Sequence, residues 1–103
     1  MIIYNVTIII DDSVHDDWLN WMKTVHIPDV MKTAKFINNK ICRVLDAEEE
    51  GGKTYAIQYT SKNKADYDDY QENHAKDLQA EHINRYAGKF GAFRTILEVV
   101  HEQ

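Results

Sequence analysis

The chain has 103 residues, with 17 acidic against 12 basic side chains and a formal net charge of −5 at pH 7. This length suits one domain with one core, and 44% hydrophobic against 28% charged residues is too apolar for a disordered chain. A negative chain without a basic patch lacks the field that attracts phosphate groups. We therefore expect no nucleic acid and no membrane surface as partner.

The single cysteine, Cys42, rules out an intramolecular disulfide framework and favours a reducing compartment. The opening segment has no positively charged region before its apolar run, and Asn5 and Thr7 interrupt that run, unlike a signal peptide. No stretch is long and apolar enough to span a membrane. These features predict a cytoplasmic protein.

The first half of the chain predicts three strands and one helix. Residues 2–10 alternate with one almost wholly apolar face, as a β-strand does. A helix should follow from about Ser13, which can cap it together with Asp16 three residues on. Two further strands are predicted over residues 36–46 and 53–60. They are joined through AEEEGG, whose glycines permit a hairpin turn.

The second half adds a long helix over residues 63–87, ended by Gly88, and a last strand over residues 92–101. The order is β-α-β-β-α-β, without repeats or a Pro-rich linker. It predicts an α+β fold of the ferredoxin-like kind, in which a four-stranded antiparallel sheet carries both helices on one face.

The segment WLNWMKTVHIPDV gathers aromatic rings, a histidine and the chain's only proline. At 100° per residue, Trp18, Trp21 and Met22 share an apolar arc that also contains His26. Pro28 disfavours helical angles at the residue before it. The helix should therefore end or kink near His26 and restart with Pro28 in its first turn.

Two interpretations of His26 follow. In the commoner one, it bonds free carbonyls at a helix C-terminus, where the helix dipole favours its protonated form. In the other, it faces a pocket between helix and sheet as a general base or an axial ligand. Trp18 and Trp21 are correspondingly either core rings packed on the sheet or walls of that pocket.

The predicted second helix has an unusually polar arc, joined by Glu81 and, at its edge, His82. The arc consists of Tyr67, Tyr70, His74, Leu78 and Arg85. Three explanations stay open: side chains with buried bodies and wet tips, a subunit interface, or the far wall of a pocket opposite His26.

The sheet face away from the helices is expected to be only half suited to water. Apolar and polar side chains are mixed there: Ile3, Asn5, Thr7, Ile9, Ile41, Arg43 and Leu45. A second copy of the chain is the simplest cover for such a face, and a symmetric dimer would close two sheets into a barrel. We therefore expect a homodimer.

Signals for metals and cofactors are weak. Along one helix, His15 and His26 would lie roughly 16 Å apart and His74 and His82 roughly 12 Å, at 1.5 Å per residue, so neither pair can share an ion. Ligands could still converge from different elements. The sequence has no phosphate-binding glycine loop and no nucleophile elbow, and Cys42 fits a small core or interface residue. We expect no metal and no cofactor.

The element order, the half-apolar sheet face and the first helix ending in HIPDV resemble the dimeric α/β-barrel superfamily, whose protomers are ferredoxin-like. More closely, YNVTIIID, WLNWMKTVHIPDVM, YAIQY, LQAEH and FGAFRTILEVV resemble a bacterial family known only as a domain of unknown function. The superfamily includes cofactor-free antibiotic-biosynthesis monooxygenases, ether-degradation-associated proteins, muconolactone isomerases and haem-binding or haem-degrading proteins. The resemblance implies a pocket between helices and sheet. His26, a histidine shortly before a proline, is similar to a residue of the ether-degradation-associated group.

Two functions remain open. In the first, a cofactor-free enzyme of the monooxygenase or isomerase type, His26 takes a proton from a carbon acid or phenol and Arg94 stabilises the resulting anion. A small apolar or aromatic ligand would be held by Trp18, Trp21, Met22, Tyr70 and His74. In the second, the chain is a non-catalytic ligand-binding or assembly module, and the same residues serve as core and cap.

Overall fold

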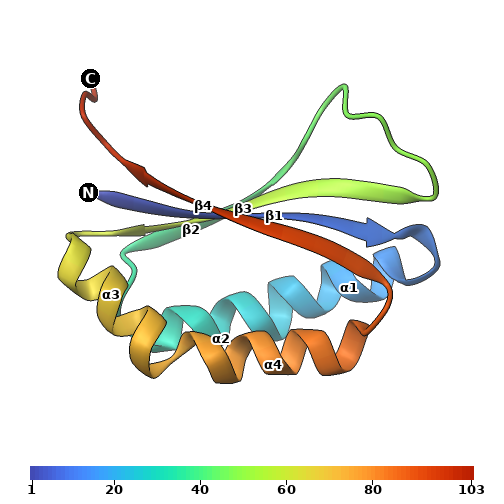
Figure 1. The fold of residues 1–103 in the computed structure, drawn as a ribbon, viewed down its shortest axis with the longest axis horizontal. Coiled ribbons are helices and arrows are strands. Elements are labelled where there is room, and N and C mark those ends of the chain that lie inside the picture. Colours follow the sequence, from blue (N-terminus) through green and yellow to red (C-terminus); the bar gives the residue numbers. More distant parts are fainter.

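The computed structural model describes all 103 residues and has one antiparallel sheet with every helix on one of its faces (Figure 1). The strands are β1 (Ile2–Asp11), β2 (Asn38–Arg43), β3 (Gly52–Ser61) and β4 (Phe90–Glu98), in the order β2-β3-β1-β4. The helices are α1 (His15–Trp21), α2 (Ile27–Lys32), α3 (Lys64–Asn73) and α4 (Ala75–Tyr86). The predicted ferredoxin-like fold is confirmed.

The core lies between the central strands and the helices. Tyr4, Ile8 and Ile10 of β1 are buried there, and Tyr55 and Ile57 of β3, which pair with Ile8 and Val6, point the same way. Because side chains alternate along a strand, the intervening residues face the bare side of the sheet. A single aromatic and aliphatic cluster results, and the helices contribute Trp18, Trp21, Met22, Ile27, Val30, Tyr70, Ala75 and Tyr86.

The start of the first helical segment differs from the prediction. Its cap is Asp11, whose carboxylate accepts hydrogen bonds from the Ser13 backbone N–H at 2.8 Å and from the Ser13 hydroxyl at 2.6 Å. A short 3₁₀ turn (Asp12–Val14) precedes α1. Ser13 therefore does not cap the helix with Asp16, because the chain already turns at the end of β1, where an aspartate is an equally good cap.

Pro28 does not end the first helical segment. The helix widens into one π turn, η2 (Met22–His26), where the Ile27 backbone N–H donates to the Met22 carbonyl, and continues directly as α2. Pro28 lies in the first turn of α2, as predicted. A proline has no N–H to give to the preceding turn, so a local widening is the least costly way to keep the helix going.

The second helical segment is two helices rather than one. It breaks at His74, whose backbone angles of φ −128° and ψ −38° are not helical, and α4 starts at the next residue. Neither glycine nor proline marks the break. Asn73 and His74 are only modest helix formers, which permits it.

Strand boundaries also moved from their predicted positions. β4 starts at Phe90, two residues early, because Gly88 at φ +74° makes a tight turn that Lys89 closes by donating to the Tyr86 carbonyl. β2 is shorter than predicted and covers only Asn38–Arg43. The loop after it returns to β3 through Gly51 at φ +74°.

Ile41 and Arg43 were predicted on the sheet face away from the helices, but both lie on the face that the helices cover. Ile41 pairs with Ile57 and Arg43 pairs with Tyr55, and both partners point to the helices. Cross-strand partners share a face, so the register of β2 places Ile41 and Arg43 there too. Leu45 follows the end of β2 and is exposed.

The bare face of the sheet is nevertheless partly apolar. Ile9 of β1 and Phe93 and Leu97 of β4 are exposed on it. In Figure 1 no helix lies over this face. None of the helices has the length and apolar character needed to cross a bilayer.

Candidate functional site

A cavity of about 210 Å³ lies between the sheet and the helices. Its sheet wall comes from β1, β3 and β4, and its helical wall from η2, α2, α3 and α4. Twelve of its sixteen lining residues are hydrophobic. An apolar cavity of roughly 150 Å³ is enough for one benzene ring, so this one has room for a single ring with a substituent.

The structure brings four of the seven predicted site residues together. Met22, His26, Tyr70 and Arg94 line the cavity. The other three, Trp18, Trp21 and His74, do not. Both tryptophans are buried in the core instead, as their helical spacing on a sheet also allowed. His74 sits at the helix break and stacks on Tyr70 with ring centroids 6.2 Å apart.

His26 lies in the π turn and lines the cavity. Its Nδ1 atom is buried and has no hydrogen-bond partner. Burial lowers the pKa of His26 to about 4, although the charge of Asp29 acts in the opposite direction. The interpretation of His26 as a protonated C-terminal cap is therefore wrong, because the helix continues through this residue and its Nδ1 bonds no carbonyl.

The π turn explains how His26 reaches the cavity. Trp18, Met22, His26 and Val30 are spaced by four residues and all face inward, being buried or lining the cavity. On a regular α-helix a four-residue spacing drifts by about 40° per step. One wider turn between Met22 and His26 removes part of that drift. The same side of the helical segment thus faces the sheet along its whole length.

His82 of α4 is the most consequential cavity residue that was not predicted from the sequence. It is 6% exposed, lines the cavity and lies next to His26, with ring centroids 5.9 Å apart. Its Nε2 accepts a hydrogen bond of 2.9 Å from the Trp18 indole N–H. The helical wheel had put His82 at the edge of the inward arc. Because the helix breaks at His74, α4 turns His82 inward and leaves Glu81 and Arg85 outside.

The electrostatic surroundings of His82 keep it neutral. Burial, and after it the neighbouring His26 and the positive charge of Arg94, together lower its pKa to about 4. Two adjacent imidazoles in an apolar wall are therefore both uncharged at neutral pH.

Arg94 supplies the cavity's only formal charge at neutral pH. Its Nε donates to the Tyr4 hydroxyl at 3.0 Å, and no carboxylate pairs with it. No aspartate or glutamate lines the cavity. The hydroxyls of Tyr59 and Tyr70 also belong to this wall, and burial raises the pKa of both, so both stay protonated.

The sequence matches one family along almost its whole length. The matching family, Domain of unknown function (DUF4286), covers residues 1–100. The chain is a member of the DUF4286 family. No curated protein matches it.

Solved structures match the DUF4286 chain in fold. A dimeric ferredoxin-like protein from an uncultured marine organism has a TM-score of 0.74 at 15% identity, covering 100% of this chain and 98% of that one. A protein of Nitrosomonas europaea, described provisionally as an antibiotic biosynthesis monooxygenase, has a TM-score of 0.68 at 9% identity, with 98% and 100% covered. A variant of MhuD with two manganese protoporphyrin IX bound per active site has a TM-score of 0.67 at 14% identity, with 100% and 98% covered. Such low identities establish the fold alone.

The DUF4286 cavity does not fit a porphyrin. Its volume of about 210 Å³ suits one ring, whereas a porphyrin joins four pyrrole rings in one plane. No three His, Cys, Asp or Glu side chains are gathered where they could hold a metal ion.

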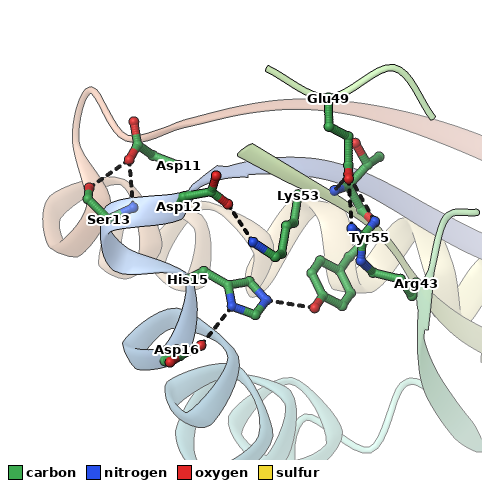
Figure 2. Close-up of polar contacts among 10 residues, drawn as sticks. Asp11, Asp12, Ser13, His15, Asp16, Arg43, Glu49, Lys53 and Tyr55 are labelled. Carbon is green, nitrogen blue, oxygen red and sulfur yellow. Dashed lines mark hydrogen bonds and ion pairs between the residues drawn. The ribbon is translucent and has the colours of Figure 1, made fainter. Parts of the chain in front are cut away.

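A second polar cluster lies at the start of α1 (Figure 2). His15 bridges the Asp16 carboxylate at 2.9 Å and the Tyr55 hydroxyl at 2.7 Å. Nearby, the Arg43 guanidinium binds the Glu49 carboxylate with two hydrogen bonds of 2.9 and 2.7 Å. No cavity is lined by these residues. The cluster therefore ties β3 and its hairpin to the first helix and offers no room for a substrate.

Proposed function

We propose that this protein binds a small, ring-sized apolar or aromatic molecule in the cavity between sheet and helices. The observation that carries the proposal is the cavity itself, in which twelve of sixteen lining residues are hydrophobic and His26, His82 and Arg94 add a few polar groups. A concave, mostly apolar site with a few polar groups is the usual form of a small-molecule binding site.

We also propose that the protein works as a homodimer in the cytoplasm. The exposed Phe93 and Leu97 on the bare sheet face support a cover by a second copy. Two similar solved structures are described as dimeric ferredoxin-like proteins, which adds to that support.

Benzyl alcohol is a suitable first probe because it has one ring and one polar group. We expect it to bind with a Kd on the order of 1 mM, since so few atoms give little binding energy. Val6 lines the cavity, and Thr7 beside it points to the bare face. Ligand-observed NMR should show that Val6→Phe, which fills the cavity, removes binding, while Thr7→Phe keeps it. Equal binding by both variants would contradict the proposal.

A second candidate is proton transfer, with His26 as the base and Arg94 holding the resulting enolate or phenolate. Both side chains line one mostly apolar cavity, which favours this chemistry. The environment of His26 opposes it. A base that takes a proton at Nε2 leaves an N–H at the enclosed Nδ1 with no acceptor, and a pKa near 4 makes a weak base.

Isomerisation of a cyclic β,γ-unsaturated ketone to its conjugated isomer would separate the two candidates. The base removes a proton from the carbon between the carbonyl and the alkene, and the proton returns to the far alkene carbon. An enzyme should accelerate this reaction, with a rate that reaches its plateau above about pH 5 and is lost in His26→Ala. If the protein binds benzyl alcohol but does not accelerate the isomerisation, only the binding function remains supported.

A further inference from the structure

The hydrogen bond from Trp18 determines where the proton of His82 sits. An indole N–H can only donate, so the Nε2 of His82 that it meets at 2.9 Å must carry a lone pair. A neutral imidazole has one proton, which then belongs to Nδ1. His82 is thus held as the Nδ1–H tautomer by a buried residue outside the cavity.

The Nδ1 atom of His82 is free to serve a ligand. It makes no hydrogen bond within the chain and, unlike Nδ1 of His26, is not fully enclosed. His82 is 6% exposed and lines the cavity, and on these grounds we assign its Nδ1 to the cavity wall. His82 therefore offers a donor there.

His26 is also expected to present an N–H donor, although a different argument locates its proton. An N–H enclosed without an acceptor is among the rarest arrangements in proteins, rarer than an unused lone pair. The tautomer with a bare Nδ1 and a proton on Nε2 is therefore the less costly one for His26. Both histidines then present N–H groups, and Arg94 adds its guanidinium.

We propose that the cavity selects an anion, specifically a single-ring carboxylate or a comparable oxyanion, whose oxygens accept from Arg94 and from the Nδ1–H of His82. Trp18 acts as a positioning residue through His82. A carboxylate has two oxygens and about four acceptor sites, enough to serve both donors. No acidic side chain lines the cavity to compete for them. This inference rests on the proposed binding function and adds the charge of the ligand.

The tautomer can be tested on the free protein, without any ligand. In two-bond ¹H–¹⁵N correlation spectra near pH 7, His82 should show the Nδ1–H pattern in the wild type. Trp18→Phe removes the donor and should shift His82 towards the Nε2–H form, whereas Trp21→Phe, the same exchange at a ring that stacks on His26, should not. An Nε2–H pattern for His82 in the wild type would overturn the inference even if Trp18→Phe fails to fold.

Three matched probes test the charge: benzoate, benzyl alcohol and benzylamine. Benzoate should bind roughly tenfold more tightly than benzyl alcohol, and benzylamine more weakly than either. Arg94→Gln should weaken benzoate by about tenfold and benzyl alcohol little, and Trp18→Phe should act in the same direction as Arg94→Gln. Benzyl alcohol binding as tightly as benzoate would overturn the anion selectivity and leave the proposed function intact. Binding of none of the three would overturn both.

Discussion

The surroundings of the two cavity histidines, His26 and His82, disfavour their protonated forms. Both have a pKa of about 4 in the fold, against an ordinary value of 6.5. In the unfolded chain they regain that ordinary value, so between pH 6.5 and 4 the unfolded state binds more protons. The free energy of unfolding must then fall as the pH falls through this window, and the contribution of these groups is complete only above about pH 6.5.

Replacing one of these histidines should therefore flatten the pH dependence of stability. By pH 5 each shifted histidine costs about 2 kcal/mol of stability relative to pH 7.5. Urea unfolding at pH 5 and pH 7.5 should show that the free energy of unfolding of His26→Gln falls between these pH values by about 2 kcal/mol less than that of the wild type. His101→Gln, at an exposed position in the C-terminal tail, is the control and should behave as the wild type. An unchanged pH dependence in His26→Gln would contradict the assigned pKa.

At the scale of single residues, the sequence identified four of the sixteen residues that line the cavity, and His82 is the most consequential of those it missed. Met22, His26, Tyr70 and Arg94 could be predicted because they fall on inward arcs or alternating positions. His82 was missed because its orientation depends on a helix break that no glycine or proline signals. The second role of Trp18, as donor to His82, joins residues 64 positions apart and has no local signature.

The π turn is the element that aligns the first helical segment with the sheet. It amounts to one residue more than a regular α-helix would hold, a feature often found at functional sites. Pro28 predicted a disturbance near His26 but not its kind. A kink and a widened turn both accommodate the missing N–H, and the inward stripe that ends in Val30 favours the wider turn.

Removing one residue from this turn should restore a regular helix and turn one half of the segment by about 100°. Deletion of Thr24, an exposed residue, should keep the circular-dichroism helix signal, lower the melting temperature and abolish benzyl alcohol binding. The control is Thr24→Ala, which removes only the side-chain bond to the Asn20 carbonyl and should still bind. Undiminished binding by the deletion variant would show that the turn does not position the site.

The whole molecule is asymmetric, with all helices on one face and an incompletely polar sheet on the other (Figure 1). Element order and fold class could be predicted because strand and helix periods alternate clearly along the sequence. Assigning β2 residues to a face was less successful. The register of β2 is set by its pairing with β3. The sequence of a six-residue strand does not by itself determine that register.

A charge on the bare face should separate the proposed subunits. Phe93 is 60% exposed on this face, so Phe93→Glu should leave the protomer folded and place a carboxylate in the proposed interface. Native mass spectrometry and light scattering should show a dimer for the wild type and a monomer for Phe93→Glu. Leu45→Glu, in the exposed hairpin loop, should remain dimeric. A monomeric wild type would contradict the proposed assembly.

The placement of the two tryptophans gives this protein an optical sensor of its own. They are the only tryptophans in the chain, and both contact the cavity histidines. Trp18 donates a hydrogen bond to His82, and Trp21 stacks on His26 at 5.1 Å and lies 5.8 Å from the ring of His82. A protonated imidazole quenches indole emission far more than a neutral one. Acidification of the cavity, or arrival of an anion beside the histidines, should therefore change the intrinsic fluorescence, and an unlabelled sample is enough to follow both events.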